Sequence, residues 1–414
     1  GVMAIRKGRM YDNYAFSDHE RKNFSILELI RRNGPITRAD ISKVTDLNIV
    51  TVSNYINSYI EKGLVSEGGM EASTGGRKPT LVKLNDDSAC AIGVDLGHMD
   101  ASGATMIGIV TDLAGRVITK VKKIRTKDTM DKVIEGSLDL IDELIKKKGV
   151  DKNKVKGVGI GIGGVIDENL GTVRDSTKNG IRTSYISIKG MIEQRFGFPS
   201  FIGNDATFAA FGEKMHALPM DIQDVIYMYS DVGSGIIIKG NMYCGASGSA
   251  GEIRINYPRN GEYLQLSKNI SFLLPTGLDL GLVSQAQKLI KEDDAKTRIS
   301  EFCDNKLNTL TVDHIIEAAK AGDTLAIELL EDGAVNLGIR VAYLVNLFNP
   351  EIVVIGGGIE KAGSLLLEPL RRTIRKWAFE EPANVVKIIP ARLGEDSVAL
   401  GAASVVIRDI FVQA

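Results

Sequence analysis

The sequence predicts an α/β protein that carries a small domain of helices and one β-hairpin at its N-terminus. With 414 residues, the chain is long enough for two or three compact domains. Residues 24–84 hold three short helical patterns and then a Gly-rich hairpin pattern. From Ala91 onward, apolar strand patterns alternate with amphipathic helices. We therefore expect an N-terminal domain over residues 1–85 and a larger domain over residues 86–414.

The first expected helix is indicated by an apolar pattern that includes Phe24. An apolar stripe through Phe24, Leu27 and Ile30 has helical spacing. The pattern stops at Gly34-Pro35, where Gly can end a helix and Pro cannot continue one. This helix should therefore bury one face and end before the proline.

Two further helices follow, separated by a tight turn. Thr37 opens the segment Thr-Arg-Ala-Asp, which resembles a capping box and predicts a helix over about residues 38–45. After the turn, Asn48 is a suitable N-cap for a third helix that runs to Lys62. Three helices with a tight turn between the second and the third form the helix-turn-helix pattern.

The third helix is expected to pack on the core with one face and to read DNA with the other. Its apolar stripe is Val52, Ile56 and Ile60. The exposed start of the helix offers short hydrogen-bonding side chains that suit base edges and phosphates in a major groove. These candidate DNA-binding residues are Thr51, Ser53, Asn54 and Asn57.

A β-ribbon after the third helix is expected to form a wing. Its Gly-rich turn carries Arg77 and Lys78, two cations that can reach phosphates or a minor groove. The alternative is a small adaptor or oligomerisation module. An exposed polar helix face combined with a wing that ends in GGRKP favours DNA binding.

The segment ISKVTDLNIVTVSNYINSYIEKGLVSEGG…STGGRKPTLVKLN closely resembles the winged helix-turn-helix of ROK-family repressors, and the resemblance covers about residues 24–85. It implies that this domain binds double-stranded operator DNA. The charge distribution agrees. Residues 1–84 hold 13 Lys and Arg against 9 Asp and Glu, whereas the rest of the chain holds 38 against 43.

In the larger domain, periodicity alone predicts only alternating strands and helices. The expected strands are residues 92–96, 106–111, 117–124 and 155–162, with a helix near residues 129–148. Four segments, GIGIGGVID, PSFIGNDATFAAFGE, GIIIKGNMYCGASGSAGEI and LVNLFNPEIVVIGGGIEKAG, resemble the ROK domain in the same order. The resemblance spans nearly all of residues 90–410. It implies an actin-like, two-lobed sugar-kinase fold with sugar and nucleotide sites between the lobes.

Three residues match sugar-contacting positions of this family. Asn204 and Asp205 follow an apolar strand in GNDA, and Glu252 lies in AGEI. Carboxylates accept hydrogen bonds and Asn both donates and accepts, so these side chains suit sugar hydroxyls. In a kinase, Asp205 would take the proton of the attacking hydroxyl. The alternative is that Asn204 and Asp205 only cap a helix over about residues 206–215.

Both phosphate loops of the family are altered in this chain. Family kinases carry Asp-x-Gly-Gly-Thr, but His98 and Met99 replace the second Gly and the Thr. The second loop, usually Gly-Thr-Gly, aligns with Tyr229, Ser230 and Asp231, and a negative charge there would repel a polyphosphate. We therefore expect no catalytic residue and no kinase activity.

The sequence also predicts no metal site and no cofactor. The zinc module of the family needs a His after the sugar-contacting glutamate and then a Cys-rich loop. Ile255 stands at the His position, and no Cys lies between Cys244 and Cys303. Four close nitrogen or sulfur ligands are therefore missing. Together with Cys90, the three cysteines lie too far apart in sequence for a disulfide framework.

Composition argues against a membrane protein. The chain is 44% hydrophobic and 25% charged, and no apolar run approaches the ~20 residues that span a bilayer. Residues 1–23 have no signal-peptide pattern. We expect a cytoplasmic protein without membrane partners.

Together these observations predict a DNA-binding transcriptional regulator, a repressor of carbohydrate-utilisation genes. A sugar or polyol effector between the two lobes would control it. The expected partners are operator DNA, the effector and a second copy in a homodimer, with a tetramer as the alternative. Two other functions stay open. Asp205 is compatible with an ATP-dependent sugar kinase that has an accessory DNA-binding module, and the altered loops are compatible with a DNA-binding scaffold that takes no ligand.

Overall fold

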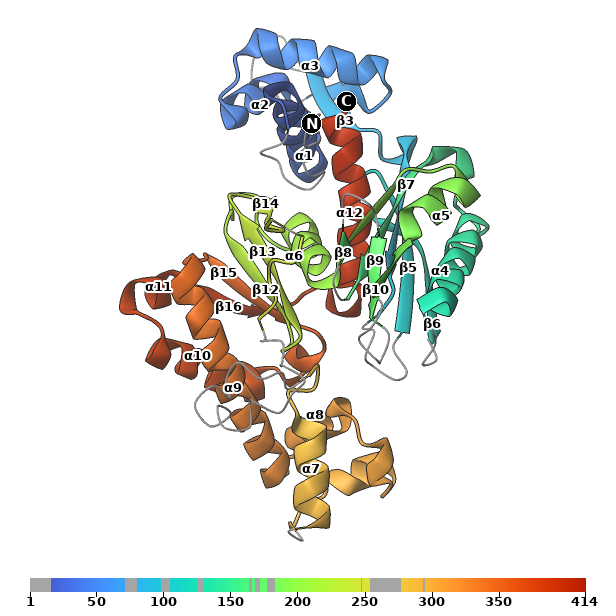
Figure 1. Ribbon diagram of the computed structural model, residues 1–414. Helices are drawn as coiled ribbons and strands as arrows, with labels where there is room; N and C mark the ends of the chain where they lie inside the picture. Colours follow the sequence, from blue (N-terminus) through green and yellow to red (C-terminus); the bar gives the residue numbers. More distant parts are fainter. Residues whose placement is uncertain are drawn as a thin grey trace, which may run out of the picture. The chain divides into compact units, whose positions relative to one another are not determined.

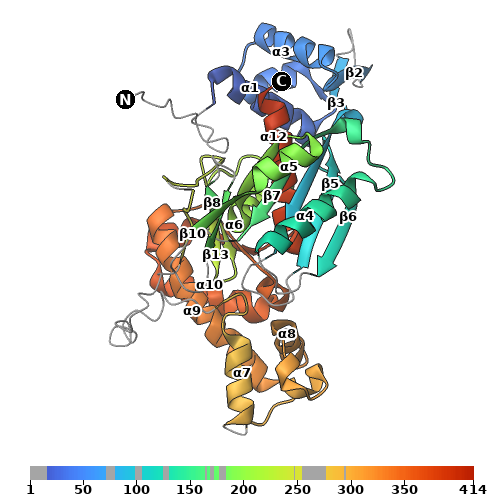
Figure 2. The same ribbon diagram turned by 45° about the vertical axis from the view of Figure 1, so that its right-hand side comes forward.

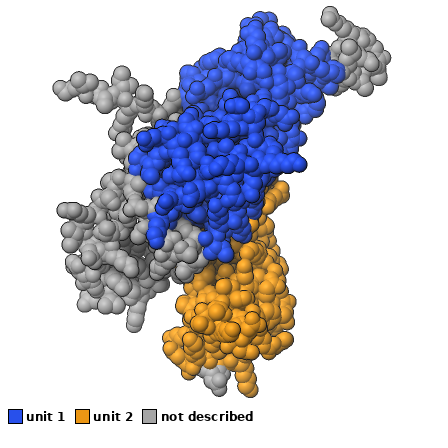
Figure 3. Space-filling model, turned by 90° about the vertical axis from the view of Figure 1, so that its right-hand side faces the viewer, with its two compact units in different colours: residues 1–208, 398–414 blue, residues 209–397 orange. Residues whose placement is uncertain are grey.

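The computed structural model describes residues 16–70, 80–97, 105–124, 130–163, 166–167, 172–176, 183–246, 248–253, 277–292 and 295–414. The chain divides into two compact units, which Figure 3 colours separately. Unit 1 comprises residues 1–208 and 398–414, and unit 2 comprises residues 209–397. Among the described helices, none is both long and apolar enough to cross a bilayer.

The N-terminal part of unit 1 contains three helices and a small antiparallel sheet (Figure 1). The helices are α1 (Asp18–Asn33), α2 (Arg38–Thr45) and α3 (Ile49–Glu61). The strands are β1 (Ile36–Thr37), β2 (Val65–Met70) and β3 (Thr80–Leu84), in the order β1-β3-β2. Thr37 and Asn48 cap α2 and α3 with their side chains, which confirms both predicted helix starts.

The second part of unit 1 is built on a mixed sheet in the order β11-β7-β4-β5-β6. Its strands are β4 (Cys90–Asp95), β5 (Thr105–Asp112), β6 (Val117–Ile124), β7 (Val155–Ile162) and β11 (Ser200–Asn204). A small antiparallel sheet contains β8 (Ile166–Asp167), β9 (Thr172–Ser176) and β10 (Thr183–Ser187). The four strands predicted at the start of the larger domain are therefore confirmed.

Helices cover both faces of this mixed sheet. On one face lie α4 (Met130–Ile145) and α5 (Ile188–Phe196), whose apolar side chains share a core with the strands (Figure 2). The C-terminal helix α12 (Ser397–Val412) packs closely on the other face. A Cβ atom on Gly93 would lie 1.9 Å from the carbonyl oxygen of Ala399, so only glycine permits this approach.

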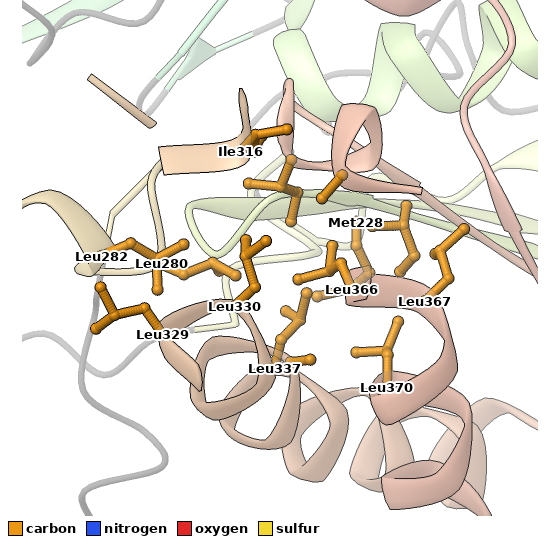
Figure 4. Close-up of a cluster of buried hydrophobic side chains, with 14 of the residues drawn as sticks. Met228, Leu280, Leu282, Ile316, Leu329, Leu330, Leu337, Leu366, Leu367 and Leu370 are labelled. Carbon is orange, nitrogen blue, oxygen red and sulfur yellow. The ribbon is translucent and has the colours of Figure 1, made fainter. Parts of the chain in front are cut away.

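Unit 2 has a second five-stranded sheet, in the order β14-β13-β12-β15-β16. Its strands are β12 (Val225–Tyr229), β13 (Gly233–Ile238), β14 (Asn241–Met242), β15 (Ile352–Gly356) and β16 (Lys387–Pro390). Its helices are α7 (Leu282–Lys291), α8 (Val312–Lys320), α9 (Thr324–Phe348), α10 (Ser364–Trp377) and α11 (Glu380–Val385). Figure 4 shows the core, in which Met228 of the sheet lies near Leu337 and Leu366 of two helices.

One helix, α6 (Asp205–His216), begins in unit 1 and ends in unit 2. The chain returns to unit 1 at the start of α12. Both crossings between the units therefore lie in the first turn of a helix, which makes α6 and α12 continuous connections between them.

Buried hydrogen bonds join the end of α12 to the N-terminal helices. The side-chain nitrogen of Asn23, on α1, donates to the carbonyl oxygens of Val412 and Ala414 at 3.2 and 3.1 Å. The side-chain oxygen of Asn23 accepts from the hydroxyl of Tyr59, on α3, at 2.8 Å. Because Asn23 and Tyr59 are both buried, these bonds fix α3 relative to the C-terminus of the chain.

Candidate DNA-binding and effector sites

The helix α3 has one buried face and one exposed stripe. The buried residues are Val52, Ile56 and Tyr59. The predicted apolar stripe was wrong at its last position, because Ile60 is exposed and Tyr59 takes its place in the core. The exposed stripe, at spacings of four, three and four residues, contains Val50, Asn54, Asn57 and Glu61.

The predicted DNA-binding residues on α3 fall into two groups. Asn54 and Asn57 lie on the exposed stripe, where a base edge could reach their amide groups. Thr51 and Ser53 lie beside the stripe and are half-buried. The remaining candidates, Arg77 and Lys78, lie outside the described residues, between β2 and β3.

Arg38, the first residue of α2, holds the stripe in place and was missed by the sequence analysis. Its guanidinium donates to the side-chain oxygen of Asn57 at 2.9 Å and to the carboxylate of Glu67, on β2, at 2.7 Å. It therefore joins α2, α3 and the hairpin. The side-chain oxygen of Asn57 accepts from Arg38. The side-chain nitrogen of Asn57 is therefore the group that can donate a hydrogen bond to a base.

Val50 begins the exposed stripe and was also missed. It is 67% exposed, and Val44 and Ile49 on either side of the turn are exposed as well. Such side chains do not stabilise the core. In a major groove, an exposed valine can contact the 5-methyl group of thymine, which is the apolar feature of the base edges. The exposed stripe of α3 therefore offers an apolar side chain at its start and polar side chains in its middle, and these suit different features of the base edges.

Asn204 and Asp205 lie where β11 ends and α6 begins. The side-chain oxygen of Asn204 accepts from the backbone nitrogens of Ala206 and Thr207 at 3.0 and 3.3 Å, so Asn204 caps α6. Asp205 is 6% exposed, and one of its oxygens accepts from the nitrogen of Ala206 at 2.7 Å. Capping therefore accounts for the oxygen of Asn204, while its amide nitrogen can still donate to a ligand.

Glu252 is exposed and belongs to unit 2, whereas Asn204 and Asp205 belong to unit 1. The preceding residue, Gly251, has a φ of +96°, and its carbonyl oxygen accepts from the nitrogen and the hydroxyl of Ser234, both at 2.9 Å. A Cβ atom there would lie 1.9 Å from the carbonyl oxygen of Ser234. Only glycine fits, and this glycine fixes the backbone that carries Glu252.

The structure changes the interpretation of Asp231. Its carboxylate forms a buried ion pair with Arg340, on α9, and both side chains are almost fully enclosed. Burial lowers the pKa of Arg340 to about 10, so the guanidinium remains protonated at neutral pH. The charge of Asp231 is therefore compensated. This ion pair weakens the expected repulsion of a polyphosphate by Asp231.

The loop around Asp231 instead packs against a neighbouring Gly-rich turn. Ser230 has a φ of +48°, and its backbone nitrogen donates to the carbonyl oxygen of Gly356 at 2.8 Å. A Cβ atom on Gly357 would lie 2.8 Å from that same nitrogen. In the first phosphate loop, the nitrogen of Gly97 donates to Asp95 at 2.8 Å, and the altered residues His98 and Met99 lie outside the described residues.

Where the structure describes the chain, no group of three or more His, Cys, Asp or Glu side chains is arranged to hold a metal ion. Ile255, at the family's zinc-ligand position, lies outside that part. The three cysteines are buried and form no disulfide bond with one another.

Comparisons with known proteins agree with this architecture. The ROK family model matches residues 91–260 and 287–409, and a winged helix-turn-helix DNA-binding model matches residues 20–66. The chain is 32% identical over 392 residues to the xylose repressor of Caldicellulosiruptor bescii, covering 93% of this chain and 95% of that protein. It is 27% identical over 387 residues to the N-acetylglucosamine repressor of Escherichia coli O157:H7, covering 93% and 91%.

A solved structure has the same fold over almost the whole chain. It is a ROK family transcriptional regulator described as a homologue of the E. coli Mlc protein, with a TM-score of 0.73 and 22% identity. The similarity covers 95% of this chain and 97% of that one.

Proposed function

This chain belongs to the ROK family, and we propose that it is a repressor of carbohydrate-utilisation genes whose operator affinity is set by a sugar or polyol. It is a DNA-binding transcriptional regulator with a winged helix-turn-helix. The observation that carries the proposal is the exposed stripe of α3, held by Arg38 within that motif. Because related repressors are named for different sugars, the effector is defined here only by class.

In this proposal, residues 1–85 bind the operator and residues 86–414 bind the effector and pair two chains. Asn54 and Asn57 contact base edges in the major groove, with Thr51 and Ser53 beside them on backbone phosphates. Arg77 and Lys78 on the wing neutralise further phosphates, which would make the affinity salt-dependent. The protein would act in the cytoplasm.

The first prediction concerns Val50. Duplexes should be selected from a random library with the full-length chain, and deoxyuridine should then replace thymine one position at a time in the selected site. We expect one thymine per half-site at which this loss of a methyl group weakens binding about fourfold, because burying one methyl contributes about 0.8 kcal/mol. Val50→Ala should remove the distinction between the two bases.

Val117→Ala is the matched control, since it shortens another exposed valine, on β6, and should change the affinity for neither the thymine duplex nor the deoxyuridine duplex. If wild-type protein binds every deoxyuridine duplex as tightly as its parent, Val50 does not read thymine. Enrichment of no duplex at all would instead contradict operator binding.

We propose that Asn204, Asp205 and Glu252 hold hydroxyl groups of the effector. The support is their match to the family's sugar-contacting residues and the burial of Asp205, because a buried carboxylate forms strong hydrogen bonds with hydroxyl groups. Asp205→Asn keeps the bond to Ala206 but removes the charge. Calorimetry with the effector should show about 10- to 150-fold weaker binding, because a hydrogen bond to a charged group contributes about 1.5–3 kcal/mol.

The exposed Asp139 provides the control for that experiment. Asp139→Asn changes the same functional group on the surface of unit 1 and should leave effector affinity unchanged. If Asp205→Asn and Asp139→Asn bind the effector equally tightly, the effector does not contact Asp205.

The altered phosphate loops support the absence of kinase activity. His98 and Met99 replace residues of the family's first loop. The buried pair of Asp231 and Arg340 stabilises a second loop that packs on Gly357. The alternative function, a sugar kinase with an accessory DNA-binding module, is favoured only by the retention of Asp205.

The two helices that connect the units, α6 and α12, could transmit the effect of effector binding to the DNA-binding helices. On α6, the side chain of Glu213 accepts from the backbone nitrogens of Arg392 and Leu393, both at 2.9 Å, and from the hydroxyl of Ser397 at 3.4 Å. Ser397 begins α12, whose far end is bonded to Asn23. A ligand at the start of α6 can thus displace α12 and, through it, α3.

A further inference from the structure

A short stretch of unit 1, between the end of α4 and the start of β7, is strongly basic. Residues 146–156 contain six lysines and one aspartate, so their net charge is 6 − 1 = +5. The chain beyond residue 84 holds 38 Lys and Arg against 43 Asp and Glu, so this stretch is basic within an acidic domain. We call it the basic segment, and its lysines are Lys146, Lys147, Lys148, Lys152, Lys154 and Lys156.

Three lysines of the basic segment are available to an anion. The first two lysines pair with carboxylates in the last turn of α4, at 2.5 and 3.1 Å, and the fifth is half-buried. The other three, Lys148, Lys152 and Lys156, are exposed and form no ion pair with a carboxylate of the described residues. Like charges held this close repel one another, and an anionic partner relieves the repulsion. A clustered patch of this kind is typical of a surface that binds nucleic acid.

The basic segment lies at the edge of the sheet where the chain arrives from the N-terminal domain. Cys90, the first residue of β4, pairs with Val155 of β7 and with Asp112 of β5. The linker before Cys90, the turn after Asp112 and the basic segment before Val155 therefore lie side by side. A Cβ atom on Gly149 would lie 3.5 Å from the side chain of Ile118, so the segment also packs on β6.

Hydrogen bonds hold the end of α3 to the same edge. The backbone and side-chain nitrogens of Asn85 donate to the carbonyl oxygens of Leu64 and Gly63, both at 2.8 Å, just after α3. The nitrogen of Leu113, in the turn between β5 and β6, donates to the carbonyl oxygen of Asp86 at 2.9 Å. The helix α3 and the basic segment are therefore connected through a few fixed contacts.

The linker is short compared with a turn of DNA. Only residues 85–89 separate β3 from β4. Five residues span at most about 17 Å when fully extended. One turn of the duplex is about 34 Å long. A duplex that continues beyond the half-site read by α3 therefore has phosphates within reach of this edge, and lysines commonly contact phosphate oxygens.

We propose that the basic segment binds backbone phosphates of the duplex beside the half-site that α3 reads. This inference rests on the proposed function, because it extends operator contact from the N-terminal domain to the larger one. Contacts to the DNA backbone position a protein without reading the sequence. The basic segment thus raises the affinity for long duplexes without changing which bases are preferred.

The test compares two duplexes made from the selected operator. The short duplex ends at the outermost base pairs whose substitution changes the affinity, and the long duplex continues for about one helical turn (~10 bp) on each side. At ~0.1 M salt, the wild-type chain should bind the long duplex more than about tenfold more tightly, because further phosphates are neutralised.

The variant Lys148→Gln, Lys152→Gln, Lys156→Gln should lose this gain and bind the short duplex like wild type. On the long duplex, the slope of log affinity against log salt should become shallower by about 2–3 for each bound chain, since each neutralised phosphate contributes ~0.9. Hydroxyl-radical footprinting should show protection of the flanking backbone by wild type that this variant lacks.

The variant Lys288→Gln, Lys291→Gln, Lys306→Gln is the matched control. It removes the same charge from three exposed lysines of unit 2, so it should keep the gain, the slope and the flanking protection of wild type. Circular dichroism of both variants should match that of wild type.

Three results would overturn this inference: equal affinity of wild type for the two duplexes, a gain that the variant of the basic segment keeps, or a gain that the control variant loses to the same extent. Each of them, in a chain that selects an operator, leaves the proposed function standing. A chain that selects no duplex would contradict the proposed function and this inference together.

Discussion

Replacing Arg340 by Leu should lower the free energy of unfolding of unit 2 by about 3–5 kcal/mol, because removal of one partner leaves the buried carboxylate of Asp231 uncompensated. Ionised groups without a partner are strongly disfavoured in a protein interior. The pair joins α9 to the turn after β12, so the damage should affect the centre of the unit. Urea denaturation followed by circular dichroism measures the loss.

Two further variants show whether the loss of stability comes from the unpaired charge of Asp231 or only from the replacement of an arginine side chain. Arg372→Leu removes an exposed arginine that pairs with Glu331, and it should cost less than about 1 kcal/mol. Asp231→Leu combined with Arg340→Leu removes both charges and should recover most of the stability. If Arg340→Leu and Arg372→Leu are equally stable, the buried pair does not stabilise the fold as described.

Replacing Asn23 by Leu should uncouple the operator from the effector. The variant breaks the bonds to Val412, Ala414 and Tyr59, and each buried group left without a partner costs about 1–3 kcal/mol. The N-terminal helices then lose their polar attachment to α12. We expect effector-free and effector-saturated protein to bind the operator within about twofold of each other, as measured by fluorescence anisotropy.

Tyr59→Phe tests the same route with a smaller change, because it removes only the hydroxyl that donates to Asn23. It should give an intermediate response. Thr373→Val removes a buried hydroxyl of α10 that bonds to Pro369, and serves as a control for general destabilisation. An undiminished response in Asn23→Leu would show that the signal does not pass through α12.

The N-terminal domain could be predicted well because its signals are local. The side chains of Thr37 and Asn48 each accept from the backbone nitrogen three residues later, and such spacings are visible in the sequence. Arg38 was missed because its partners Asn57 and Glu67 lie 19 and 29 residues away. Val50 was missed because an apolar residue in a helical pattern is normally assigned to the core.

In the larger domain too, contacts between residues far apart in the sequence could not be predicted. Its strands follow from apolar runs, but no periodicity indicates that Arg340 would reach Asp231, so that carboxylate was interpreted as an uncompensated charge. The hydrogen bond between Asn23 and Ala414 likewise joins positions that are 391 apart in the sequence, so no local pattern indicates that α12 is attached to α1. For Asn204, the residue type predicted both capping and ligand contact, and only the folded structure shows that its side-chain oxygen caps α6.

The most direct measurement is the affinity of the full-length chain for its selected operator in the presence of individual sugars. The panel should contain xylose, N-acetylglucosamine, glucose and simple polyols. The account predicts that one of them weakens operator binding about 5- to 150-fold, the usual range of coupling between two sites. With that sugar and ATP, the release of ADP should stay far below an enzymatic rate of ~1 s⁻¹. A chain that selects no operator, or that phosphorylates a sugar at such a rate while no sugar changes its DNA affinity, would contradict the account.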